Sequence, residues 1–162
     1  MYRLFDRKDR LHNVPTNTAL DDITDGIASA HSIFNQQRRG SDESSVVIMV
    51  VQADEKNFAD QRLLHFNLLA RSNGSVRMHR ATMAELGADE DNVGGSGTFF
   101  DKSTRSYYYK GEMVSVFYFR SGYTPEDYVG EIEWAARRSI EMSSAIKCPS
   151  LGYHLAGRQR IV

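Results

Sequence analysis

Cysteine is almost absent from this chain, which has one among its 162 residues, so no disulfide bond can form within it. A single thiol is typical of a reducing compartment, and we expect a cytoplasmic protein. No apolar run approaches the roughly 20 residues that a membrane span needs. Residues 1–8 are polar and charged, without the apolar stretch of a secretory signal. We therefore expect no membrane insertion.

An excess of charge of one sign is also missing, because 20 basic side chains balance 21 acidic ones. A nucleic-acid groove or an anionic membrane surface requires a basic excess, so neither is an expected partner. The 5 histidines include no pair at metal-ligand spacing, so we expect no metal site. The length fits a single domain over residues 1–162, with its core at about 20–157.

Hydrophobic periodicity predicts that helices and strands alternate along the chain. We expect helices over residues 17–37, 57–71 and 125–146, a short helix at 83–86, and strands at 46–51, 76–80 and 115–119. A β-hairpin is expected at residues 106–116, with Lys110 and Gly111 in its turn. This order predicts an α/β fold with a three-layer, Rossmann-like, mainly parallel sheet flanked by helices.

Each long helix carries apolar residues three and four positions apart, which predicts one buried face per helix. For the first helix these are Leu20, Ile23, Ile27, Ala30 and Phe34. For the second they are Phe58, Leu63 or Leu64, Phe66, Leu68 and Leu69, and for the third Tyr128, Ile132, Ala136, Ile140 and Ser143. Thr124 and Asp127 form a capping-box pattern, with Pro125 at the first helical position.

Two segments follow predicted strands, at the position where open α/β sheets bind their ligands. In the first, Asn57 and Gln61 lie on one face of a helix's opening turn, which offers unpaired backbone N–H groups. In the second, residues 120–123 combine a guanidinium, a glycine and a phenol, and a guanidinium suits a carboxylate or phosphate. Together they predict a pocket for a small carboxylate-bearing ligand.

Structural roles are the alternative for the same residues. Glu55 and Asn57 are also typical loop and helix-capping residues, and Arg120 also fits a structural ion pair. Tyr123 also fits a ring folded over the sheet edge. A nucleotide-binding Rossmann module is poorly supported, because the loop after the first strand has no glycine fingerprint and the glycines at 94–97 follow no strand.

Five blocks of the sequence resemble one known family in order and spacing, from about residue 20 to the end. They are EKNFADQR at 55–62, VFYFRSGYTP at 116–125, WAARRSIE at 134–141, AIKCP at 145–149 and LAG at 155–157. The chain is similar to the substrate-binding domain of eukaryotic-type glutathione synthetase. Five blocks in register make a chance match improbable, whereas any one motif alone is weak.

The resemblance implies an ATP-grasp enzyme, usually a homodimer, that joins γ-glutamylcysteine to glycine with ATP and magnesium to make glutathione. An acyl phosphate forms on the cysteinyl carboxylate, and the glycine amine attacks it. The residues implied to bind substrate form two groups, Glu55, Lys56, Asn57 and Gln61, and Arg120, Ser121, Gly122 and Tyr123. The implied pocket coincides with the pocket predicted from the strand ends.

The chain also departs from the family. Members are much longer, and the implied magnesium ligands, glycine-rich ATP loop and substrate-orienting arginine fall outside residues 1–162. The implied ATP-contacting lysine is replaced by Gln159, a neutral amide between Arg158 and Arg160. We therefore expect no catalytic residue here and no ligation by this chain alone. The alternative is a non-catalytic derivative that binds glutathione-like peptides or dimerises with the full-length enzyme, which Gln159 favours.

Overall fold

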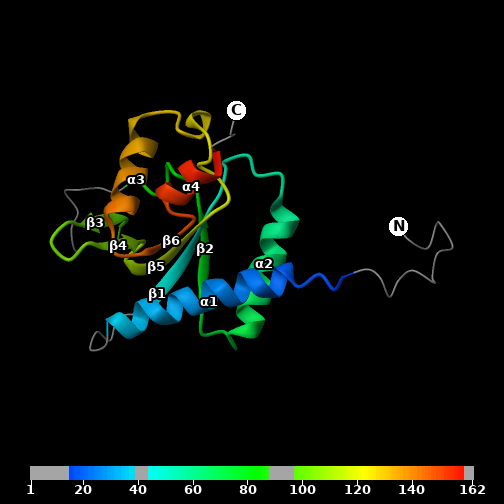
Figure 1. Ribbon diagram of the computed structural model, residues 1–162. Helices are drawn as coiled ribbons and strands as arrows, with labels where there is room; N and C mark the ends of the chain where they lie inside the picture. The colour runs from blue at the N-terminus through cyan, green and yellow to red at the C-terminus, as the bar shows by residue number, and fades with distance from the viewer. Residues whose placement is uncertain (1–14, 39–43, 88–96, 159–162) are drawn as a thin grey trace.

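A computed structural model describes residues 15–38, 44–87 and 97–158 and has an α/β fold, as predicted (Figure 1). Its elements are α1 (Ala19–Gln37), β1 (Ser45–Val50), α2 (Phe58–Arg71), β2 (Met78–Ala81), β3 (Phe99–Asp101), β4 (Ser106–Tyr109), β5 (Glu112–Phe119), a 3₁₀ helix (Pro125–Asp127), α3 (Glu131–Met142), β6 (Ile146–Cys148) and α4 (Leu151–Arg158). Among these residues no helix is both long and apolar enough to cross a bilayer.

The strands form one mixed sheet in the order β2-β1-β5-β4-β3, with β6 also paired to β5. β1 is parallel to β2 and β5, and β6 is parallel to β5, whereas β4 is antiparallel to both β3 and β5. The predicted hairpin is confirmed as β4 and β5, and its turn residues Lys110 and Gly111 have φ angles of 52° and 79°. The prediction of a mainly parallel, Rossmann-like sheet is not confirmed.

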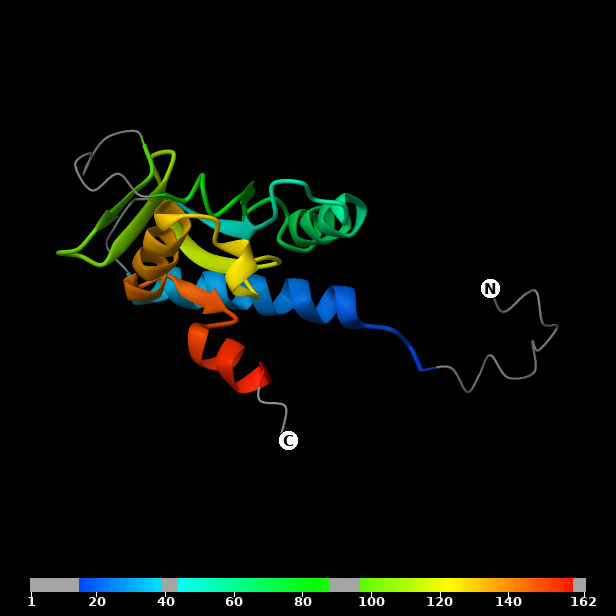
Figure 2. The same cartoon turned by 90° about the horizontal axis from the view of Figure 1, so that it is seen from above.

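Both faces of the sheet are covered at its central strand, β1. β1 is entirely buried, and its residues alternate between two apolar clusters. One cluster joins Val46, Ile48 and Val50 to α3, and the other joins Val47 and Met49 to α1 and α2. The helices α1 and α2 therefore cover one face and α3 covers the other, and Figures 1 and 2 show α1 crossing beside α2.

The buried face of α1 is turned from the predicted one, because Thr24 and His31 are buried while Ile23 is 40% exposed. The reason is a polar contact with the sheet. His31 Nδ1 lies 2.7 Å from Ser115 Oγ, and this hydroxyl donates to the carbonyl oxygen of Val46 at 2.8 Å. Because Ser115 uses its hydrogen for Val46, we assign the Nδ1–H tautomer to His31.

Ser115 occupies a β-bulge in β5. Val46 of β1 pairs with Val114, and the next residue, Val47, pairs with Val116, so Ser115 has no partner in the ladder. Asn35 on α1 approaches the far side of the His31 ring, with its Nδ2 3.0 Å from His31 Nε2. The bulge is thus packed under α1 by a small polar network, and burial lowers the pKa of His31 below its ordinary 6.5.

The apolar face predicted for α2 is only partly confirmed. Leu64 and Leu68 are buried together with the polar Gln61. The other apolar residues named for this face lie outside, between 40% and 56% exposed: Phe58, Leu63, Phe66 and Leu69. α2 covers the sheet with one narrow stripe, so its remaining apolar side chains project away from the core.

The long helix predicted over 125–146 is wrong as a single element. The capping box of Thr124 and Asp127 exists, but it serves the 3₁₀ helix Pro125–Asp127. Gly130 is extended (φ −151°, ψ −172°), and it begins α3 with its N–H donated to Glu133 Oε2 at 2.9 Å. Of the predicted face, Ala136, Ile140 and Ser143 are buried, whereas Ile132 is 61% exposed.

Three further segments differ from the prediction. β3 and β6 are strands of three residues each that periodicity did not indicate, because such short segments carry too few residues to define a period. The expected helix at 83–86 is a single turn, closed by the N–H of Leu86 on the carbonyl of Thr82 at 3.1 Å. The glycines at 94–96 and the residue Gln159 lie outside the described residues.

Candidate functional site

The two predicted binding segments leave the sheet at one edge. β1 and β5 are adjacent and parallel, so their carboxyl ends lie next to each other. The N–H of Arg120 donates to the carbonyl of Val50 at 2.8 Å, which fixes the start of the second segment against the end of β1. The structure therefore brings residues 55–61 and 120–123 to the same edge, as expected for ligand sites of open α/β sheets.

In the first segment, Glu55 is the centre of the hydrogen bonding. Its Oε1 accepts the N–H of Asn57 at 2.7 Å, and its Oε2 accepts the side-chain amide of Gln61. Gln61 is 2% exposed, and its Oε1 has no hydrogen-bond partner in the structure. Lys56 and Asn57 are exposed, and the Asn57 side chain makes no capping hydrogen bond to α2. The segment thus offers acceptor oxygens beside an ammonium and an amide.

In the second segment, the backbone turns sharply after β5. Gly122 has a φ of +82°, and a Cβ there would meet the hydroxyl oxygen of Tyr128 at 3.0 Å, so glycine is required. Ser121 is buried. The Tyr123 hydroxyl donates to the carbonyl of Phe119 at 2.6 Å, so this ring does fold over the sheet edge. Partial burial raises the pKa of Tyr123, which keeps its hydroxyl protonated near neutral pH.

The structural alternative for Arg120 has no support in the described part of the chain, where its guanidinium forms no ion pair. The side chain is half-buried at the sheet edge. A guanidinium held there presents a forked donor for a carboxylate or phosphate.

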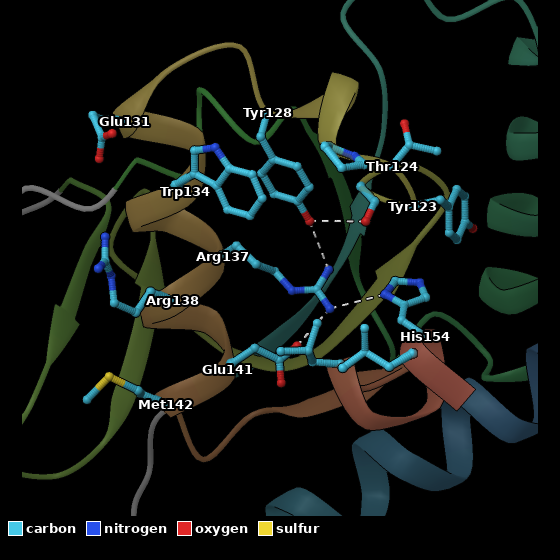
Figure 3. A pocket seen from close by; sticks show the side chains of 14 residues that line it. Tyr123, Thr124, Tyr128, Glu131, Trp134, Arg137, Arg138, Glu141, Met142 and His154 are labelled. Atoms are coloured by element: carbon cyan, nitrogen blue, oxygen red, sulfur yellow. Dashed lines mark hydrogen bonds and ion pairs between the residues drawn. The ribbon is translucent and has the colours of Figure 1, made fainter. Parts of the chain in front are cut away.

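A cavity of about 700 Å³ lies on the α3 and α4 side of the second segment (Figure 3). Arg137 is buried at its centre, where Nη1 donates to the Tyr128 hydroxyl at 3.2 Å. Nη2 lies 3.1 Å from His154 Nδ1 and 2.9 Å from Glu141 Oε1. Figure 3 shows these partners converging on the guanidinium, which also sits 4.3 Å from the centre of the Phe119 ring.

Of the eight predicted substrate-binding residues, Gly122 and Tyr123 line this cavity, and the residues of the first segment do not. The eight residues therefore share a sheet edge but not one enclosed cavity. Sequence reasoning did not single out Arg137 or His154. An arginine on an apolar helix face, with Glu141 four positions later, is the signal that was available for the buried pair.

Comparison with known proteins identifies the family. The model of the family described as eukaryotic glutathione synthase matches residues 45–156. The chain belongs to this family. The matched range contains both predicted binding segments and all the residues that line the cavity, and it confirms the resemblance seen in the five sequence blocks.

Curated relatives of the chain carry the name of this family. The glutathione synthetase of Dictyostelium discoideum is 42% identical over 155 residues, which cover 93% of this chain and 29% of the relative. The chloroplastic enzyme of Arabidopsis thaliana is 38% identical over 148 residues, covering 91% and 24%. The human glutathione synthetase is 31% identical over 137 residues, covering 84% and 25%. The chain thus spans between 24% and 29% of the length of these relatives.

The described ranges of the chain contain no group of three or more His, Cys, Asp or Glu side chains placed to hold a metal ion. The single cysteine, Cys148, is an exposed thiol whose pKa is raised by partial burial.

Proposed function

We propose that this chain is the substrate-binding part of a glutathione synthetase and that the segments after β1 and β5 bind γ-glutamylcysteine or glutathione. The observation that carries the proposal is that both segments leave the sheet at the same edge, where the N–H of Arg120 donates to the Val50 carbonyl at the end of β1 at 2.8 Å. Both segments lie inside the range that matches the family.

Complementary chemistry supports this assignment. The γ-glutamyl end of the peptide carries an ammonium and a carboxylate. We assign the ammonium to the oxygens of Glu55 and Gln61, because Gln61 Oε1 is buried without a partner and gains one from a bound donor. We assign a peptide carboxylate to the Arg120 guanidinium. Lys56, Asn57, Ser121, Gly122 and Tyr123 complete the proposed contact surface at these two segments.

ATP and magnesium belong to the proposal for the complete enzyme. ATP supplies the phosphoryl group that activates the cysteinyl carboxylate, and the metal neutralises phosphate charge. The described residues present no metal-ligating cluster, and position 159 carries glutamine. We therefore propose that this chain holds the dipeptide and that other parts of an ATP-grasp enzyme perform the ligation, with the cytoplasm as the proposed compartment.

Titration of ¹⁵N-labelled chain with γ-glutamylcysteine and then glutathione tests the binding role. We expect saturable amide shifts at residues 55–61 and 120–123. Arg120→Ala should abolish them, whereas Arg138→Ala, which removes an exposed arginine on α3, should not. A dispersed spectrum that shows no saturable shift with either peptide contradicts the proposal.

A second candidate is a non-catalytic derivative that binds glutathione-like peptides or dimerises with the full-length enzyme, and Gln159 favours it because an amide cannot replace an ammonium beside phosphates. Release of ADP by this chain, dependent on γ-glutamylcysteine and glycine, would exclude the derivative and would show that the chain ligates alone.

We also propose that the chain pairs with a second copy through α2. Phe58 and Phe66 are 50% and 56% exposed, and the Arg62 guanidinium lies 5.2 Å and 5.4 Å from their ring centres. Such an aromatic and arginine surface is typical of interface centres. Sedimentation equilibrium should show a dimer, and Phe66→Ser should weaken it. Tyr153→Ser is the control, because it removes another exposed aromatic ring, on α4, and should leave the dimer intact. A monomer at all concentrations contradicts this assignment.

A further inference from the structure

We propose that Asp127 is a positioning residue for the substrate site, one that sets the segment after β5 in place relative to the segment after β1. This inference rests on the proposed function, because it concerns the same two segments. Asp127 itself lies in the 3₁₀ helix that follows them, and the sequence marks it only as half of a capping box.

One carboxylate oxygen of Asp127 holds three consecutive backbone amides. Its Oδ2 accepts the N–H groups of Gly122 at 3.1 Å, Tyr123 at 2.8 Å and Thr124 at 3.1 Å. A capping box requires only the last of these contacts. The other two amides belong to residues of the proposed contact surface, and hydrogen bonds to an ionised carboxylate are stronger than neutral ones.

The other oxygen of Asp127 reaches the loop between β1 and the first segment. Gln52 lies in this loop, two residues after the end of β1, and its Nε2 lies 3.4 Å from Asp127 Oδ1. At that length the contact is weak by itself. The contact nevertheless means that one carboxylate touches both the loop after β1 and the turn after β5. Glu55 follows Gln52 by three residues in the loop after β1.

The opposite side of the Gly122 peptide is held as well. The Tyr128 hydroxyl donates to the Gly122 carbonyl at 3.0 Å and in turn accepts from Arg137 at 3.2 Å. The φ of +82° at Gly122 is what allows its N–H to turn toward Asp127 while its carbonyl faces Tyr128. Asp127 therefore holds the turn through the Gly122 N–H, while Tyr128 holds it through the Gly122 carbonyl. This turn places Arg120 and Tyr123 at the edge of the sheet.

Replacing Asp127 with asparagine removes the negative charge but keeps nearly the same side-chain shape. The amide keeps a single acceptor oxygen, so it either faces the three N–H groups with a neutral oxygen or presents its own NH₂ group to them. Both arrangements loosen the turn without removing a buried apolar group. We expect Asp127→Asn to raise the dissociation constant for γ-glutamylcysteine about tenfold, as for the loss of one good hydrogen bond.

Three variants test this inference on the whole chain, with affinity measured by calorimetry and the backbone by ¹⁵N NMR. In Asp127→Asn we expect the amide protons of Gly122, Tyr123 and Thr124 to move upfield and exchange faster, together with the tenfold loss of affinity. Gln52→Ala, on an exposed loop, should weaken binding by about twofold with those three amides unchanged. Glu126→Gln removes the neighbouring exposed carboxylate and should alter neither quantity.

The outcomes separate the inference from the function on which it rests. Unchanged affinity in Asp127→Asn, with binding intact in the parent chain, overturns the positioning role and leaves the proposed function standing. Equal losses in Asp127→Asn and Glu126→Gln also overturn it, because a general charge effect would then explain both. Absence of binding in the parent chain overturns the proposed function, and the role of Asp127 falls with it.

Discussion

Replacing Arg137 by methionine should destabilise the chain strongly, because Arg137 is the buried cation that joins α3, α4 and the turn after β5. Its side chain is 6% exposed, and that of its partner Glu141 is 23% exposed. The guanidinium also serves Tyr128 and His154, so methionine fills the space but removes a donor from three groups at once.

The size of the stability loss follows from the Glu141 charge that the substitution leaves unpaired. Breaking a buried ion pair from one side costs about 3–5 kcal/mol, because the remaining charge stays desolvated. Glu141 keeps partial access to water, which favours the lower end, so we expect a loss of about 3 kcal/mol in the free energy of unfolding. Replacing both partners, as Arg137→Met with Glu141→Leu, should recover at least about 1 kcal/mol of this loss, because no unpaired charge remains.

Urea denaturation followed by far-UV circular dichroism at neutral pH measures these differences. Arg138→Met is the matched control, because it makes the same substitution at the adjacent, exposed position of α3 and should change stability by less than about 0.5 kcal/mol. The reasoning is refuted if Arg137→Met and Arg138→Met are equally stable, or if adding Glu141→Leu increases the loss.

Two further predictions concern buried polar groups. Because burial lowers the pKa of His31 below 6.5, the unfolded chain binds more protons, and stability should fall as the pH decreases from about 6.5. In His31→Gln, the free energy of unfolding measured by urea denaturation should decrease less steeply between pH 7 and 5.5 than in the parent chain. Burial also lowers the pKa of His65, but this residue contributes equally to both proteins. Identical pH dependences would contradict the role of His31. Tyr107 is 1% exposed and donates its hydroxyl to the Leu86 carbonyl, so Tyr107→Phe should cost about 1–2 kcal/mol in the same assay. Tyr153→Phe, at a hydroxyl-bearing ring that is 77% exposed, should cost nothing measurable, and equal effects would refute the role of the Tyr107 hydrogen bond.

Much of the fold could be predicted from the sequence, because the strongest signals were local. The unbroken apolar run at 46–51, rich in β-branched residues, predicted a fully buried strand, and β1 has no exposed residue. The Lys110–Gly111 turn predicted the hairpin. The faces of α1 and α2 were predicted less well, because burial there depends on which side meets the sheet. His31 is buried by a contact to Ser115, 84 positions away, which no local period can reveal.

The candidate site shows the same division. The segments at 55–61 and 120–123 could be located, because they follow strands and resemble a family. Their junction needed the strand order, in which β5 lies beside β1. Asp127 could be predicted only as half of a capping box, because the pattern shows the contact to Thr124 and not those to Gly122 and Tyr123. Arg137 was missed because its partners Tyr128 and His154 lie 9 and 17 positions away in the sequence.

The single unpaired residue in β5 determines which way the end of that strand faces. Side chains along a strand alternate between the two faces, yet Val114 and Val116 lie in opposite clusters, because Ser115 resets the alternation between them. Every residue from Val116 onward therefore has its orientation fixed by this one insertion. If Ser115 were paired in the ladder instead of bulged out, the two faces of the strand's second half would be exchanged, Phe117 and Phe119 would turn toward α1, and Arg120 would lie on the other side of the sheet. Deleting Ser115 would instead keep Val114 and Val116 opposite Val46 and Val47. The bulge at Ser115, packed under α1, thus determines which side of the sheet Arg120 faces five residues later.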